Sequence, residues 1–264
     1  MSTLTFTLVQ ANLRWEDKAA NLKHLGDLIA GLREKTEVVL LPEMFTTGFS
    51  MDPERLGESM DGPTVDWIRQ TAAARKIVLA GSFIATDNGE HYNRLVWMLP
   101  NGQYGCYDKR HLFAYADEDQ HYAPGAKRLI ASVKGWKINL QVCYDLRFPV
   151  WARNRIDTNG QPEYDVLVYV ANWPERRNLA WKTLLRARAI ENQCFVIGVN
   201  RVGRDGKDIA YSGDSMVIDP QGDILYHREG IEDTYTITLD KTRLEETRGR
   251  FPFLRDADEF TIAP

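Results

Sequence analysis

The sequence has 264 residues, of which 44% are hydrophobic and 27% are charged, and these ordinary values exclude a disordered, collagen-like or coiled-coil chain. Its net charge of -4 comes without a large basic cluster, so the composition argues against a nucleic-acid partner. The first residues lack the pattern of a secretory signal, and no apolar run is long enough to span a bilayer. We therefore expect a single cytoplasmic domain over residues 1–264 that has no membrane partner.

Apolar segments that predict strands alternate with segments of helical periodicity. The predicted strands are Thr5–Gln10, Val38–Leu41, Val78–Ile84, Val96–Leu99, Ile138–Val142, Val166–Ala171, Phe195–Asn200, Ser215–Ile218 and Thr234–Leu239. The predicted helices are Lys18–Leu32, Thr64–Arg75, Val150–Arg155 and Leu179–Asn192. Runs such as Val166–Ala171 are apolar without alternation, which is typical of strands covered on both faces. This order predicts a layered α/β fold.

The last third of the chain contains more strand than helix. Three short strand patterns follow one another at Tyr211–Ile218, Asp223–His227 and Tyr235–Leu239. The sequence Asp219-Pro220-Gln221-Gly222 is a strong turn signal between the first two, so we expect a hairpin-like unit here. Charged residues with interspersed aromatic residues fill 241–264, which we interpret as a C-terminal extension that wraps the body or a partner subunit.

The three cysteines are Cys106, Cys143 and Cys194, and they form no CxxC pair and have no histidine at metal-ligand spacing. We therefore expect neither a disulfide framework nor a metal site. Cys106 and Cys194 lie in strand-like segments and are interpreted as packing residues. Cys143 follows Ile138–Val142 at a strand-to-helix turn, where nearby N–H groups can stabilise a thiolate or an oxyanion. Cys143 is thus the candidate nucleophile, and the alternative is an inert buried cysteine.

Two other residues stand at the ends of predicted strands and have suitable chemistry. Glu43 follows the buried strand Val38–Leu41, and Lys109 follows a short strand-like stretch. The carboxylate is a candidate base for the thiol, and the ammonium is a candidate for holding a developing oxyanion. His111, two residues beyond Lys109, is the alternative base, in a Cys–His pair. We favour the carboxylate, because a histidine so close to a charged strand end is more often structural.

Four blocks of sequence resemble, in order, the conserved segments of one known family. They are Leu41-Pro42-Glu43-Met44-Phe45, Asp108-Lys109-Arg110-His111-Leu112-Phe113, Val142-Cys143-Tyr144-Asp145-Leu146-Arg147-Phe148-Pro149, and Asn172-Trp173-Pro174 through Trp181 with Arg186-Ala187-Arg188-Ala189-Ile190-Glu191-Asn192-Gln193. The first three resemble the catalytic motifs of the nitrilase superfamily of C–N hydrolases, and the likeness extends to about Leu239. The resemblance implies a four-layer αββα sandwich whose subunits pair through helices as a homodimer.

The resemblance also implies a role for each candidate residue. Cys143 would be the nucleophile and Glu43 the general base and acid. Lys109 and the backbone N–H of Tyr144 would hold the oxyanion. The second glutamate of the family matches Glu118, which lies in an acidic loop. The reaction would pass through a thioester that water hydrolyses, so neither a metal nor an organic cofactor is required.

Within the superfamily, the segment from Glu43 to Phe49 and the Asn172-Trp173-Pro174 block look most like the omega-amidases, which hydrolyse 2-oxoglutaramate and 2-oxosuccinamate. The substrate would then be a small amide with a carboxylate. The candidate binding residues are three arginines, Arg147, Arg176 and Arg177, and three aromatic residues, Phe49, Tyr115 and Trp173. A carbamoyl or N-acyl amide hydrolase of the same superfamily is an alternative. A catalytically silent metabolite-binding homologue is another, which the presence of all three reactive residues disfavours.

Overall fold

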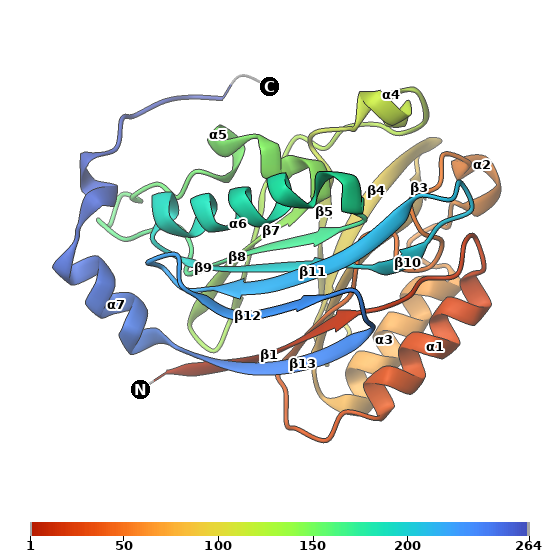
Figure 1. Ribbon diagram of the computed structural model, residues 1–264, viewed down its shortest axis with the longest axis horizontal. Coiled ribbons are helices and arrows are strands. Elements are labelled where there is room, and N and C mark those ends of the chain that lie inside the picture. The colour runs from red at the N-terminus through yellow and green to blue at the C-terminus, as the bar shows by residue number, and fades with distance from the viewer. Residues whose placement is uncertain (1, 263–264) are drawn as a thin grey trace.

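Two β-sheets pack face to face, and helices cover the two outer faces (Figure 1). The computed structural model describes residues 2–262. The α/β prediction and the four-layer αββα sandwich are both confirmed.

The first sheet has the strand order β13-β1-β2-β3-β4-β5. Its strands are β1 (Thr3–Gln10), β2 (Val38–Leu40), β3 (Val78–Asp87), β4 (Glu90–Met98), β5 (Tyr104–Asp108) and β13 (Asp233–Asp240). Strands β1, β2 and β3 are parallel, whereas β4, β5 and β13 pair antiparallel to their neighbours.

The second sheet has the order β10-β11-β9-β8-β7-β6, and β12 pairs with β11. Its strands are β6 (Leu129–Val133), β7 (Trp136–Val142), β8 (Val166–Ala171), β9 (Phe195–Asn200), β10 (Val202–Arg204), β11 (Ala210–Ile218) and β12 (Ile224–Glu229). The central strands β7, β8 and β9 are parallel, so their carboxyl ends lie at the same edge of the sheet.

The longest helices lie on opposite outer sides of the molecule, with α1 and α3 along the first sheet and α6 along the second (Figure 1). The α-helices are α1 (Lys18–Ala30), α2 (Pro53–Leu56), α3 (Pro63–Arg75), α4 (Glu118–His121), α5 (Pro149–Ala152), α6 (Asn178–Asn192) and α7 (Lys241–Arg250). The 3-10 helices are η1 (Ala114–Ala116), η2 (Cys143–Arg147), η3 (Glu175–Arg177) and η4 (Phe253–Asp256). No helix in the described part of the chain is apolar and long enough to cross a bilayer.

The main core lies between the sheets, because alternate residues of each strand point inward. Leu4, Phe6 and Leu8 of β1 belong to the same buried cluster as Ile138 and Leu140 of β7. A second cluster joins Leu25 and Ile29 of α1 to the other face of the first sheet. Helix α6 lies close to its sheet at Gly198, where an added Cβ would come within 2.6 Å of a Leu185 methyl carbon. Only glycine permits this close approach.

The predicted helix Val150–Arg155 is too long, because α5 is a single turn that ends at Ala152. The hairpin-like unit around Asp219–Gly222 is confirmed as the antiparallel pair of β11 and β12. The third strand pattern is not part of it, because β13 crosses to the first sheet and pairs with β1. Strand β5 is the short strand-like stretch before Lys109, whereas β6 and β10 were not predicted, since both are short.

The first part of the predicted C-terminal extension is the helix α7, which contacts its own chain. Leu244 is buried, and the Arg248 guanidinium donates hydrogen bonds to an Asp165 carboxylate oxygen at 3.0 Å and to the Gln193 carbonyl oxygen at 2.8 Å. The role of the remaining residues as an arm toward a partner subunit stays a prediction.

Candidate active site

Three candidate side chains follow strand ends at one edge of the sandwich. Glu43 comes shortly after β2, Lys109 directly after β5, and Cys143 directly after β7. The two sheets meet here, because Asn172, which follows β8, donates its backbone N–H to Glu43 Oε2 at 2.7 Å. Side chains far apart in sequence are therefore brought together by the edges of two different sheets.

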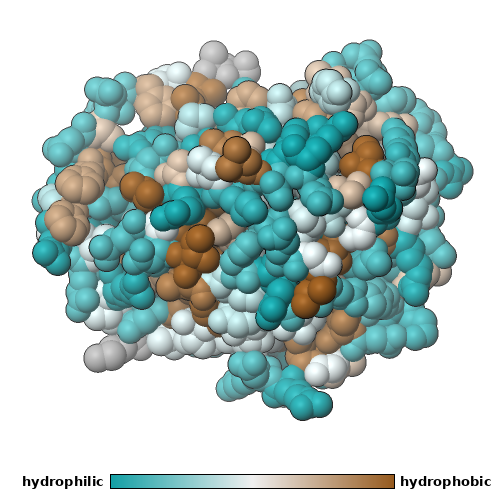
Figure 2. Space-filling view, viewed as in Figure 1, coloured by the Kyte–Doolittle hydropathy of each residue, from teal (hydrophilic) through white to brown (hydrophobic). Residues whose placement is uncertain are grey.

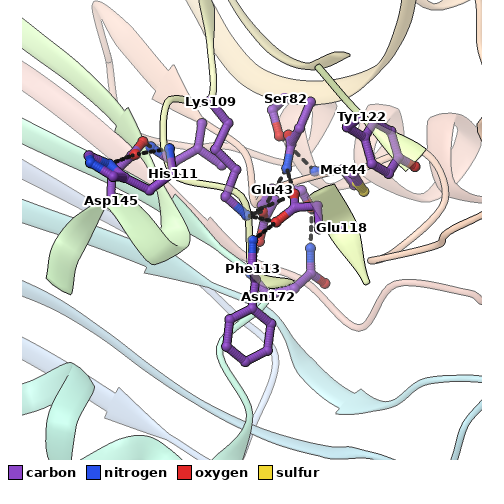
Figure 3. A network of polar contacts seen from close by, with 12 residues as sticks. Glu43, Met44, Ser82, Lys109, His111, Phe113, Glu118, Tyr122, Asp145 and Asn172 are labelled. Atoms are coloured by element: carbon purple, nitrogen blue, oxygen red, sulfur yellow. Dashed lines mark hydrogen bonds and ion pairs between the residues drawn. The ribbon is translucent and has the colours of Figure 1, made fainter. Parts of the chain in front are cut away.

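Lys109 lies between two buried carboxylates (Figure 3). Its Nζ is 3.0 Å from Glu43 Oε1 and 2.9 and 2.8 Å from the two carboxylate oxygens of Glu118. All three side chains are at most 1% exposed. Glu118 also accepts the backbone N–H of Phe113 at 2.6 Å. The sequence therefore identified a real cluster, and Glu118 of α4 is its third member.

The charges of this cluster depend on each other. Burial by itself lowers the pKa of Lys109, but the negative charges of Glu118 and Glu43 outweigh it and hold that pKa above its ordinary value. Burial raises the pKa of Glu118 and the charge of Glu43 raises it further, while Lys109 acts in the opposite direction. Lys109 is thus a fixed cation across the whole physiological pH range.

Cys143 begins η2 with a φ of +45°, in the left-handed region, and its side chain is almost completely buried. Burial raises the pKa of its thiol well above the ordinary value, and the negative charge of Glu43 raises it further. Lys109 lowers it, but by less. The thiol is therefore protonated at neutral pH and next to a carboxylate that can accept the proton.

We expect the alkylation rate of Cys143 by iodoacetamide to keep rising beyond pH 9, because the reactive thiolate forms only above the raised pKa. Mass spectrometry of the labelled peptide measures the rate at each pH. In the Cys143→Ala variant, the remaining labelling reports Cys106 and Cys194, the other two free cysteines. A rate that levels off below pH 8 would show a thiol with a lowered pKa and contradict this prediction.

A cavity of about 140 Å³ opens beside the thiol. Nine of the predicted site residues line it: Phe49, Lys109, Tyr115, Cys143, Tyr144, Arg147, Trp173, Arg176 and Arg177. Glu43 and Glu118 do not line it and lie behind Lys109 and Cys143. Tyr144 is in the first turn of η2, where backbone N–H groups have no partner within the helix.

The mouth of the cavity carries three positive side chains. The Arg147 guanidinium lies 4.9 Å from the Trp173 ring centroid, and that of Arg177 lies 5.0 Å from the Phe113 ring centroid. Burial lowers the pKa of Arg177, and the neighbouring charge of Arg176 lowers it further. Crowded guanidinium groups of this kind favour the binding of an anion.

His111 lies to one side of the carboxylate cluster (Figure 3). Its Nδ1 is 2.8 Å from Asp145 Oδ1, its ring stacks on Phe148 at a centroid distance of 3.8 Å, and it does not line the cavity. Asp145 also accepts the backbone N–H of Val142 at 3.0 Å. His111 therefore ties the loop after β5 to the turn that carries Cys143, and this geometry disfavours the alternative of a Cys–His pair.

Two asparagines of the site had no role in the sequence analysis. Asn93, in β4, is fully buried and donates its side-chain N–H groups to both Glu43 and Glu118. Asn172 donates its side-chain amide to the Glu43 carbonyl oxygen at 2.5 Å. Asn172 could have been found, since it lies in the fourth sequence block. No signal pointed to Asn93, because its surroundings, Tyr92 and Arg94, read as a polar strand end.

One group of potential metal ligands lies away from this cavity, at Asp214, His227 and Glu229, whose ligand atoms lie within 4.8 Å of one another. Asp214 already accepts hydrogen bonds from His227 and Ser212 and is 3.3 Å from the Lys182 ammonium. A lysine at this distance neutralises the carboxylate and repels a cation, so the group is better explained as a charge-paired network.

The chain is similar to several known hydrolases over nearly its full length. Residues 5–249 match the carbon-nitrogen hydrolase family. The omega-amidase YafV of Escherichia coli K12 is 44% identical, with 99% of this chain and 100% of that protein covered. A 2-oxoglutaramate amidase of Bacillus subtilis is 31% identical, with 96% of each covered. A crystal structure of a CN-hydrolase superfamily protein from Xanthomonas campestris, with an arsenic adduct in its active site, has a TM-score of 0.97 and 47% identity, with both chains fully covered.

The matched range, the sandwich and the thiol at the strand end agree with one another, and this chain belongs to the carbon–nitrogen hydrolase family. The chain is thus an enzyme that cleaves carbon–nitrogen bonds, and Cys143 lies where the nucleophile of this family is expected. The resemblance to the nitrilase superfamily that the sequence motifs predicted is confirmed.

Proposed function

We propose that this hydrolase is an omega-amidase, which cleaves the terminal amide of a small 2-oxo acid such as 2-oxoglutaramate to the acid and ammonia. The observation that carries the proposal is the buried cluster of Lys109 with Glu43 and Glu118 directly beside the thiol of Cys143. Cys143 supplies the nucleophile, and the cluster supplies the base and the cation. The relatives named omega-amidase and 2-oxoglutaramate amidase support the choice of substrate.

The first step is the attack of Cys143 Sγ on the amide carbon. The thiol proton passes to the Glu43 carboxylate, because burial keeps the thiol protonated until a base accepts the proton. The carbonyl oxygen becomes an oxyanion that the Lys109 ammonium and the Tyr144 backbone N–H stabilise. Glu43 then gives its proton to the leaving nitrogen, ammonia departs, and a thioester on Cys143 remains.

Water completes the reaction. Glu43, ionised again, accepts a proton from a water molecule that attacks the thioester carbon. The tetrahedral intermediate uses the same oxyanion contacts and collapses to the carboxylic acid, and the thiolate of Cys143 recovers its proton from Glu43. The protons balance over the cycle, and no metal or organic group takes part in it.

The contacts of Lys109 allow it to serve the oxyanion without losing either carboxylate. The ammonium has three donors, and it contacts one oxygen of Glu43 and both oxygens of Glu118. An oxyanion in the cavity would replace one of the two contacts with Glu118. Glu118 therefore acts as the anchor that keeps Lys109 in place through both half-reactions.

The substrate carboxylate would bind at the mouth of the cavity. The guanidinium groups of Arg147 and Arg177 lie over the rings of Trp173 and Phe113, and they line the cavity as forked donors for a carboxylate. Arg176 is exposed and adds positive charge to the entrance. Phe49 and Tyr115 line the same cavity and restrict the length of the chain between the carboxylate and the amide.

A panel of substrates tests this assignment by ammonia release. We expect turnover of a short 2-oxo-dicarboxylate monoamide and a loss of roughly 100-fold in kcat/KM for the same molecule with its carboxylate esterified, because charge-assisted hydrogen bonds to arginine are lost. Nitriles and ureido compounds are included, and Cys143→Ala is the inactive control. A preference for the ureido compounds would replace the proposed substrate with a carbamoyl compound and leave the thiol mechanism in place.

We further infer that the enzyme acts as a homodimer in the cytoplasm. Large apolar side chains are exposed on the second-sheet side, with Val150 of α5 55% exposed and Leu179 and Ile190 of α6 75% and 52% exposed. Figure 2 shows brown areas among hydrophilic ones on the face that carries α6. Burial of these side chains against a second copy would stabilise the pair by removing apolar surface from water.

A further inference from the structure

Asn93 lies in the middle of β4, opposite Ile84 of β3. It is fully buried, and its backbone carbonyl oxygen accepts the N–H of Lys109 at 3.0 Å. The strand pairing therefore fixes Asn93 beside the residue that carries the catalytic cation. Asn93 does not line the cavity, so any effect on the reaction passes through its neighbours.

The Asn93 side chain touches both carboxylates of the site. Its Nδ2 donates to Glu43 Oε1 at 2.8 Å and to Glu118 Oε1 at 3.2 Å. The opposite orientation of the amide would place Oδ1 against two carboxylates, so the chemistry fixes the assignment of the two atoms. Within residues 2–262, Oδ1 is buried without a hydrogen-bond partner. The Asn93 amide therefore has its donors paired with Glu43 and Glu118, while its oxygen is left unpaired.

The donors around Glu43 leave one oxygen with a free position for a proton. Oε1 accepts from both Asn93 and Lys109, which occupies its two lone pairs. Oε2 accepts only the backbone N–H of Asn172, so one lone pair remains. Of the two Glu43 oxygens, Oε2 is therefore the one that can receive a proton from Cys143.

We propose that Asn93 is a positioning residue that stabilises Glu43 and Glu118 in their ionised forms and directs the proton of Cys143 to Glu43 Oε2. This inference rests on the proposed function, in which Glu43 is the base. A hydrogen bond donated to a carboxylate favours its ionised form, so loss of the Asn93 amide makes both carboxylates bind protons more readily.

The other titratable groups near Glu43 come from several elements. Lys109 follows β5, Glu118 is in α4, and Cys143 begins η2. Tyr122 follows α4 and Tyr211 is in β11, and burial raises the pKa of both. Both tyrosines are therefore neutral in the pH range of the test.

The test compares the pH profile of the wild-type enzyme with that of Asn93→Leu, which keeps the size of the side chain and removes the amide. We expect kcat/KM to fall by roughly tenfold to 100-fold with little change in KM, because the lost hydrogen bonds involve ionised groups behind the cavity. The acidic limb of the kcat/KM profile should move upward by roughly one pH unit. Asn93→Ser, which keeps one donor, should move it by less.

Asn139→Leu is the matched control, because Asn139 of β7 is also fully buried and its amide has no hydrogen-bond partner within residues 2–262. We expect this control to keep the wild-type pH profile. If Asn93→Leu does not fold, Asn93→Ser carries the test. An acidic limb that stays in place in the Asn93 variants, or that moves equally in Asn139→Leu, would overturn the proposal.

A measurement without substrate separates this inference from the proposed function. Infrared titration detects protonated carboxyl groups, and the difference between each protein and its Glu43→Gln variant isolates the signal of Glu43. We expect that signal to appear at higher pH in Asn93→Leu than in the wild type, even if the amide panel shows that the substrate is a different one. An identical titration in the two proteins would refute the role of Asn93 and leave the hydrolase assignment intact.

Discussion

The Glu43→Gln variant is expected to lose amide hydrolysis by about 10²-fold to 10⁴-fold, the contribution of a well-placed general base. Both oxygens of Glu43 face donors, since Oε1 accepts from Asn93 and Lys109 and Oε2 accepts the N–H of Asn172. In either orientation of the glutamine side chain, its NH2 group would face another hydrogen-bond donor. The neutral amide also cannot accept the proton of the Cys143 thiol. Single-turnover ammonia release measures the loss.

The control for this variant is His111→Asn, which can still donate a hydrogen bond to Asp145, the partner of His111. We expect it to keep most of the activity, because His111 does not line the cavity. A Glu43→Gln enzyme within tenfold of the wild type, combined with an inactive His111→Asn enzyme, would assign the base to His111 instead.

The Lys109→Met variant is expected to be destabilised by about 3–5 kcal/mol at pH 8, because removal of one partner leaves buried charge uncompensated. The loss of folding stability relative to the wild type should become smaller as the pH falls. Burial already raises the pKa of Glu118, and without Lys109 the folded state binds a proton there still more tightly than the unfolded state does, so the penalty is fully present above the folded pKa and is relieved as the pH falls below it. Urea unfolding at pH 8 and pH 5.5 measures both effects.

The double variant Lys109→Met with Glu118→Gln tests whether uncompensated buried charge causes the loss of stability. It removes one of the two carboxylates that Lys109 neutralises, so it should recover part of the stability that Lys109→Met loses. The same loss of unfolding free energy at both pH values, or no regained stability in the double variant, would mean that Lys109 stabilises the fold by packing rather than by charge.

The sequence by itself determined the fold class and located the candidate reactive residues. Apolar runs such as Val166–Ala171 identify buried strands, because strands covered on both faces need no polar alternation. Polar residues that directly follow such runs must lie at a sheet edge, which is how Glu43 and Cys143 were found. The order of the blocks around them was specific enough to identify the family.

The tertiary structure decided what depends on distance between segments. Asn93 lies within a strand whose sequence looks like a polar edge, and only the tertiary fold, which brings Glu118 of α4 against it, makes it a buried residue. The pairing of β13 with β1, as the edge strand of the first sheet, likewise cannot be read from the turn that precedes β13. Local patterns report which face of an element is covered, whereas contacts between elements depend on where the whole chain places them. Asn93, which donates hydrogen bonds to both buried carboxylates of the site, belongs to this second group.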